Sequence, residues 1–200
     1  LSAVLVIPAS AADTGFQNPT TNAAVTTAGD GNGYEQNPTS AYADGGGNAS
    51  NMNGAGDQHI FGGYNLSGIP SGDTISGIEV RLDWWLDSTT GTNSMSVALS
   101  WDGGASWTAA QNTTGEPTTQ TTSTLGSPTN NWGHTPWTTT ELSNLRVRVT
   151  CNSTEGTRDF YLDWVAVRVW SNFTITASAG AGGSIAPSGS VSVVPGANRT

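Results

Sequence analysis

Apolar and polar residues alternate along four segments of the chain, at residues 78–87, 95–101, 145–151 and 160–170. A period of two is typical of a β-strand that has one face in the core and the other toward solvent. In the first three segments the predicted core positions are Ile78, Val80, Leu82, Trp84, Leu86, Met95, Val97, Leu99, Trp101, Leu145, Val147, Val149 and Cys151. Outside the apolar N-terminus no ten-residue stretch has the apolar spacing of a helix, so the pattern predicts an all-β protein.

The fourth segment changes its register part of the way along. Val165, Val167 and Val169 are its predicted core residues, but Phe160 and Leu162 are apolar at positions of the opposite parity. An extra residue in the strand reconciles the two halves, so we expect a β-bulge near Asp163.

The composition supports the same fold class. The chain is rich in Gly, Ser, Thr and Asn, only 10% of its 200 residues are charged, and it contains no Lys, so strong helix formers are scarce. A chain of this length has room for one proper core. We therefore expect an antiparallel β-sandwich of the jelly-roll type.

Charge and cysteine content exclude some partners. The formal net charge of −9 repels phosphate backbones, so nucleic acid is not an expected partner. Cys151 is the one cysteine, which excludes an internal disulfide and a thiolate metal cluster.

The two ends predict a domain organisation. Residues 1–11 resemble the end of a secretory signal peptide that closes on Ala9-x-Ala11, so the protein is expected to be secreted, with no membrane span in the mature chain. An ordinary first strand, or a strand donated to a neighbouring subunit, would also fit this segment. Residues 12–171 are the predicted sandwich. Residues 172–200 look like the start of a small β repeat domain of the kind found in bacterial surface proteins.

Residues 100–107 contain the pattern Ser100-x-Asp102-x-Gly104-x-x-Trp107. It resembles the Asp-box of sialidases and other secreted β-proteins, which implies a structural hairpin turn. The carboxylate would accept backbone N–H groups, the glycine would allow positive φ, and the indole would cover the turn.

Residues 69–80 together with residues 160–169 look like the galactose-binding-like jelly-roll group, which includes many carbohydrate-binding modules. In several of those modules the Asp of the last strand binds a structural calcium ion, and Asp163 occupies that position. Further oxygen donors lie at Asp30 and Asn32, and at Asp44 and Asp57. Plain turns at Asn32-Gly33 and after Asp44 explain these loops equally well.

Arginine and tryptophan fall on the polar side of the predicted strands, at Arg81, Trp85, Arg146, Arg148, Trp164 and Arg168. If the strands are neighbours, Trp85 and Trp164 offer rings on which a sugar stacks, and Arg81 and Arg168 offer planar hydrogen-bond donors. The alternative is that each arginine stacks on a tryptophan or pairs with Glu79 or Asp83, and no ligand is bound.

The sequence gives little support for catalysis. His59 and His134 are solitary and far from any Gly-x-Ser-x-Gly motif, so no triad can be assembled. Glu79 and Asp83 share a strand face with Arg81, which favours ion pairing over the raised pKa of a catalytic acid.

We therefore expect a non-catalytic extracellular module that binds a polysaccharide and adjoins further domains of the same chain. The alternative is a structural or adhesive module of a cell-surface or filament protein, with self-association through strand exchange.

Overall fold

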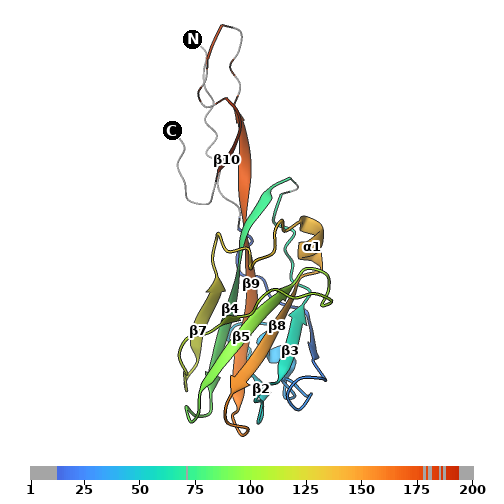
Figure 1. The fold of residues 1–200 in the computed structure, drawn as a ribbon, viewed down its shortest axis with the longest axis vertical. Coiled ribbons are helices and arrows are strands. Elements are labelled where there is room, and N and C mark those ends of the chain that lie inside the picture. The colour runs from blue at the N-terminus through green and yellow to red at the C-terminus, as the bar shows by residue number, and fades with distance from the viewer. Residues whose placement is uncertain are drawn as a thin grey trace.

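The computed structural model describes residues 13–70, 72–177, 179, 182–184, 186 and 188–193, and it is an antiparallel β-sandwich (Figure 1). One sheet, called here the β8 sheet, has the order β1-β3-β8-β5-β6; its strands are Thr21–Ala24, Gln58–Gly62, Arg146–Ser153, Asn93–Ser100 and Gln111–Asn112. The other, the β4–β9 sheet, has the order β10-β9-β4-β7; its strands are Gly189–Val193, Phe160–Ala177, Thr74–Leu86 and Thr121–Gly126. The short strand β2 (Ala49–Asn51) pairs with β9.

From β3 onward the chain passes repeatedly from one sheet to the other: β3, β5 and β8 lie in one layer, and β4, β7 and β9 lie in the other. These crossings give the jelly-roll type of sandwich and confirm the predicted fold class. The helices are short, a 3-10 turn η1 (Pro38–Ala41) and one α-helix α1 (Thr139–Ser143), which agrees with the scarcity of helix formers. Within the described residues, no helix has the length and apolar character needed to cross a membrane.

Alternation identifies the core correctly. All the core positions predicted in the first three segments are buried except Trp101, which is partly buried against the core. Trp84 is the largest fully buried side chain, and its indole N–H donates to the Ser123 hydroxyl at 2.9 Å. Cys151 is 1% exposed, and burial raises the pKa of its thiol to about 12, so it acts as a small core residue.

The predicted bulge is confirmed. β4 and β9 are paired antiparallel, with Asp83 opposite Trp164 and Trp84 opposite Leu162, so Asp163 is the extra residue. Because of the bulge, the apolar side chains of both halves of β9 face the core. Those of Phe160, Leu162, Val165, Val167 and Val169 are all fully buried. It also brings the Asp163 carboxylate next to that of Asp83 on the outer side of the sheet.

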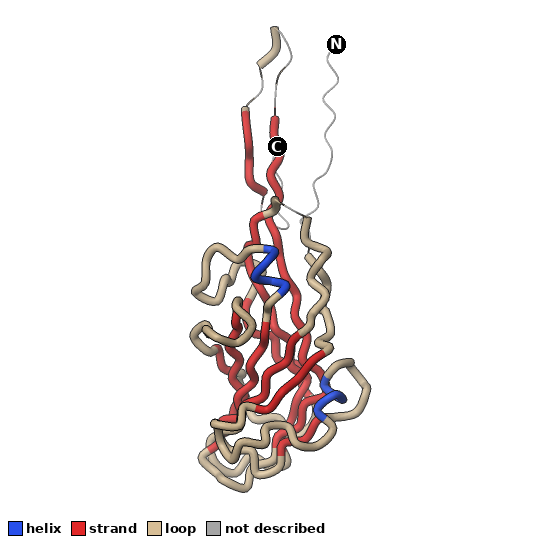
Figure 2. Tube along the Cα trace, turned by 90° about the vertical axis from the view of Figure 1, so that its right-hand side faces the viewer, coloured by secondary structure: helices blue, strands red, loops and turns tan. Residues whose placement is uncertain are grey.

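The strand β9 extends beyond the sandwich and there pairs with β10, as Figures 1 and 2 show. The predicted boundary between residues 171 and 172 therefore lies inside a continuous strand. Residues 1–11, the predicted signal peptide, lie outside the described residues, and so does much of the predicted repeat segment. Both assignments remain predictions.

Candidate functional site

The outer side of β4 and β9 brings four predicted site residues together. Glu79 is opposite Arg168, Arg81 opposite Ala166, Asp83 opposite Trp164 and Trp85 opposite Tyr161. We call the surface formed by Arg81, Trp85, Trp164 and Arg168 the Trp–Arg face. Arg146 and Arg148 lie on β8 in the other sheet, so the six-residue patch considered from the sequence is divided between two faces.

At one end of the Trp–Arg face, Arg168 is fully engaged by its neighbours. Its Nε donates to Glu79 Oε2 at 2.7 Å, and its Nη2 lies 2.6 Å from the same oxygen in an ion pair. The guanidinium carbon lies 4.7 Å from the Trp170 ring centroid and 4.5 Å from that of Phe16. The indole N–H of Trp170 also donates to Glu79, at 3.0 Å. These contacts match the pairing alternative, in which the arginine covers the sheet.

In the middle of the face, Arg81 forms a two-point ion pair with Asp83. Nε and Nη2 donate to the two carboxylate oxygens at 3.0 and 2.7 Å, and these hydrogen bonds raise the pKa of Arg81 above its ordinary value. The guanidinium carbon also lies 4.6 Å from the Trp164 ring centroid. Trp164 donates its indole N–H to Asn18 at 2.8 Å and meets Phe16 edge-on, so much of this ring is already in contact with protein.

Trp85 differs from its neighbours on this face. It is half-buried and stacks on Tyr161, with ring centroids 5.3 Å apart and an interplanar angle of 20°. Six tryptophans donate their indole N–H to a protein acceptor: Trp84, Trp107, Trp132, Trp137, Trp164 and Trp170. Within the described part of the chain, the indole N–H of Trp85 has no such acceptor, and neither has that of Trp101. Trp85 therefore keeps a free indole N–H, while its ring stacks on Tyr161.

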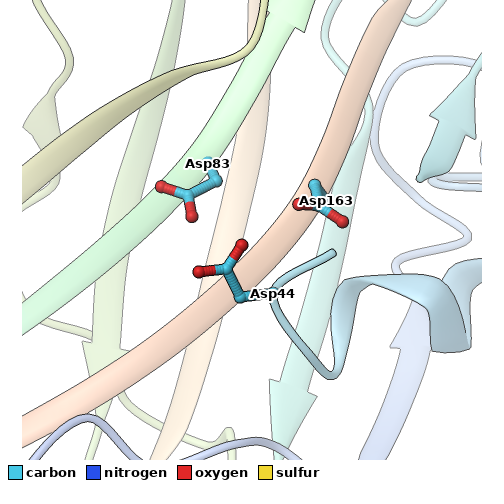
Figure 3. A group of neighbouring side chains, drawn as sticks. All are labelled: Asp44, Asp83 and Asp163. Carbon is cyan, nitrogen blue, oxygen red and sulfur yellow. The ribbon is translucent and has the colours of Figure 1, made fainter. Parts of the chain in front are cut away.

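Three carboxylates converge beside Arg81 (Figure 3). Asp83 comes from β4, Asp163 from the bulge of β9, and Asp44 from the loop after η1, and one ligand oxygen from each lies within 4.8 Å of the others. Asp83 and Asp163 are buried, whereas Asp44 is exposed. We call these residues the acidic cluster. Asp44 also lies 3.5 Å from Arg81 Nη2, so the single arginine offsets only part of the charge.

The acidic cluster could hold a metal ion, and its spacing suits an ion with oxygen ligands such as calcium. Calcium takes oxygen ligands at about 2.3–2.6 Å, so ligands of one ion lie at most about 5 Å apart. The spacing in the cluster is within that limit. Asp163 is 3% exposed; its Oδ2 accepts from the Gly45 N–H and the Gln120 side chain, but its Oδ1 is buried and has no partner among the described residues. A bound cation would satisfy this oxygen and the remaining negative charge.

Asp30 and Asn32, the other predicted metal ligands, do not belong to the acidic cluster. The Asp30 carboxylate accepts hydrogen bonds from the backbone N–H and the side-chain amide of Asn32, at 3.1 and 2.9 Å. The backbone N–H of Asp30 donates to Asp57. The structure therefore shows a hydrogen-bonded turn at these residues, in which the side chain of Asp30 is occupied locally.

The turn at residues 100–107 has a dense set of hydrogen bonds. The Asp102 carboxylate accepts from the Ser106 N–H at 2.8 Å and from the Ser100 hydroxyl at 2.9 Å, and these bonds lower the pKa of Asp102 to about 2. Gly104 has a φ of 113°, which favours glycine. The Trp107 indole N–H donates to the Gly104 carbonyl at 3.1 Å. These contacts give Asp102 a structural role in the turn.

The two histidines lie apart in different surroundings. His59 is buried, with Nδ1 accepting from the Tyr34 N–H at 3.0 Å and Nε2 lying 2.9 Å from Asn22 Oδ1. His134 stacks on Trp101 at 4.1 Å, and its Nε2 lies 3.1 Å from Glu141. Aromatic and polar packing accounts for the contacts of both rings.

Comparison with known proteins gives a limited result. No protein-family model matches the chain, and no match was found among the curated proteins. A solved structure of the Clostridium thermocellum N-terminal endo-1,4-β-D-xylanase 10B, comprising CBM22-1 and GH10 modules complexed with xylohexaose, matches with a TM-score of 0.36 and 15% identity. The match covers 83% of this chain and 28% of that one, so this chain spans well under half of the xylanase chain.

Two contributors to the site were missed from the sequence. The sequence indicates only an ion-pair partner in Asp83, because its position in the acidic cluster depends on the loop that brings Asp44 to it. Tyr161 was not singled out as a surface aromatic. The signal was available, since Tyr161 alternates with the buried residues Phe160 and Leu162.

Proposed function

We propose that this chain is a non-catalytic, secreted carbohydrate-binding module, with Trp85 as the ring on which a neutral sugar stacks. The supporting observation is the free, half-exposed indole of Trp85 beside Tyr161, since the other aromatic residues of the face are occupied by arginine or asparagine. A sugar ring that covers about 60 Å² of apolar surface gains roughly 1.5 kcal/mol. Arg81 supplies polar contacts from the same strand face.

The test is affinity electrophoresis in gels that contain neutral polysaccharides. Trp85→Ala should weaken retention about tenfold, which corresponds to the loss of about 1.4 kcal/mol. Trp101→Ala is the matched control, because it removes the other indole without an acceptor at the end of β5 in the other sheet, and it should leave retention unchanged. Melting curves establish that both variants fold. If no neutral polysaccharide retains the wild-type protein, or both variants lose retention equally, the proposed site is wrong.

The proposal includes a structural calcium ion held by Asp44, Asp83 and Asp163. The ion would stabilise the junction of β4, β9 and the loop after η1, and would take no part in chemistry. Calcium should raise the melting temperature above its value in EDTA, and Asp163→Asn should abolish most of that rise. Identical melting curves with calcium and with EDTA would remove the ion from the proposal.

A structural or adhesive role is the second candidate. The supporting observation is the β9–β10 pair, which extends beyond the sandwich (Figure 1). Within the described residues, β10 pairs with β9 alone. A two-stranded ribbon is of marginal stability alone, so neighbouring protein would stabilise it. Concentration-dependent association in analytical ultracentrifugation, together with no retention by polysaccharides, would favour this role.

A further inference from the structure

The β8 sheet has an unusual charge composition for this protein. Its five strands contain two arginines, Arg146 and Arg148, and no Asp or Glu. The chain as a whole has a net charge of −9, and the β4–β9 sheet carries Glu79, Asp83 and Asp163. An acidic protein therefore presents one sheet whose charged side chains are all cationic.

Arg148 is the unsatisfied cation on this sheet. It lies on β8 between Ile60 of β3 and Ala98 of β5, neither of which can pair with a charge. Arg81, Arg158 and Arg168 each have a carboxylate partner, but in the described chain no carboxylate lies within 4.0 Å of Arg148. Its Nε is buried without an acceptor, and burial lowers the pKa of Arg148 below its ordinary value.

Trp107 provides a ring beside this cation. The Arg148 guanidinium carbon lies 4.3 Å from the ring centroid, and the indole is half-exposed. The hydrogen bond from Thr108 N–H to the Leu99 carbonyl holds this segment against β5, and the indole N–H is fixed by Gly104. Asp102, which belongs to the same turn, directs its carboxylate to Ser100 and Ser106. The ring is therefore held in position by its own turn.

We propose that Arg148 and Trp107 form a binding site for a carboxylated polysaccharide, with the uronate carboxylate on Arg148 and the sugar ring against the exposed part of the Trp107 indole that the guanidinium does not cover. A carboxylate matches the planar donors of a guanidinium and would supply the counter-charge that the protein lacks here. The net charge of −9 repels both a uronate polymer and a phosphate polymer, and it repels the more densely charged phosphate polymer more strongly. This site lies on the opposite sheet from Trp85 and does not depend on the proposed function.

The experiment measures affinity for polygalacturonate and for its fully methyl-esterified form, which has the same backbone without the charge. EDTA is present throughout, so that no cation bridges the polymer to the acidic cluster. The wild-type protein should bind the acid form about tenfold more tightly than the ester. Arg148→Met should remove that difference, and Trp107→Leu should weaken binding to both forms severalfold.

Two further variants keep the result interpretable. Arg146→Met removes the same charge from the same strand, but the Nη1 of Arg146 already donates to the Asn144 and Leu145 carbonyls, so the expected loss is at most about twofold. Arg148→Lys keeps the charge and the aliphatic stem, and should retain part of the preference for the acid form. Melting curves identify any variant that fails to fold.

Three results would overturn this site. The first is equal binding of the acid and the ester by the wild-type protein. The second is an equal loss in Arg146→Met and Arg148→Met, which would indicate diffuse charge. The third is binding of single-stranded DNA as tight as that of polygalacturonate. Loss of neutral-polysaccharide retention in Trp85→Ala is a separate result and bears only on the other face.

Discussion

The outer faces of the two sheets use arginine and tryptophan in opposite ways. On the β4–β9 sheet, Arg81 and Arg168 each contact both a carboxylate and an aromatic ring. On the β8 sheet, Arg148 contacts a ring alone among the described residues. The same residue types thus form ion-paired arginines on one side and an arginine without a carboxylate partner on the other, so composition alone does not define a binding face.

Strand register produces this difference. Glu79 is directly opposite Arg168, and Asp83 follows Arg81 by two positions on the same face of β4. The positions opposite Arg148 are Ile60 and Ala98. Because side chains directly opposite one another on a sheet are its closest lateral neighbours, cross-strand pairing gives Arg168 an acid and leaves Arg148 without one. Arg81 instead finds Asp83 on its own strand.

The largest expected effect is a loss of stability at low pH. It arises at His59, which is buried on the core side of the β8 sheet. Burial lowers its pKa to about 4, from the ordinary 6.5 that it regains on unfolding. The unfolded chain therefore binds the proton first, so stability is complete above about pH 6.5 and falls as the pH drops toward 4. The expected loss is about 3 kcal/mol, because each pKa unit corresponds to about 1.4 kcal/mol.

Urea unfolding at pH 7 and at pH 4.5 measures this effect. His59→Gln should lose less stability between the two pH values than the wild-type protein does. Equal pH-dependent losses in the His59 variant and the wild type would show that His59 does not carry the acid sensitivity.

The same substitution on the two faces tests the comparison itself. Arg168→Met leaves Glu79, which is 7% exposed, without its cation and should cost about 1–2 kcal/mol, a value reduced because Arg168 is half-exposed. Arg148→Met separates no ion pair and should cost less than about 0.5 kcal/mol. Chemical denaturation of both variants measures the difference. Equal destabilisation by the two substitutions would mean that the faces do not differ in this way.

The smallest expected effect is at the 100–107 turn. The backbone N–H of Ser106 and its other partners lower the pKa of Asp102 to about 2, which is below that of an unfolded Asp. The charge therefore adds stability above about pH 4, and this contribution is lost as the pH falls toward 2. Asp102→Asn should melt below the wild type at pH 6, and the two melting temperatures should converge at pH 2. A constant difference in melting temperature would contradict this role.

Local pattern was sufficient for β4, β5, β8 and β9, for the core positions on those strands and for the bulge. The parity change between Leu162 and Val165 required one extra residue, and that residue is Asp163. The candidate metal ligands are predicted less well, because Asp30 and Asn32 form a hydrogen-bonded turn outside the acidic cluster. A turn and an ion site use the same residue types. Which of the two forms depends on whether neighbouring segments bring further carboxylates close.

The sequence by itself determined which side of each strand faces the core, since alternation fixes the side-chain direction wherever one face is buried. The tertiary structure alone decided which strands share a sheet, and therefore that Arg148 lies apart from Arg81. It also decided that Asp44, Asp83 and Asp163 meet, although they are widely separated along the chain. The physical reason is that pairing and loop docking minimise the free energy of the whole sandwich, whereas alternation is a property of each strand alone.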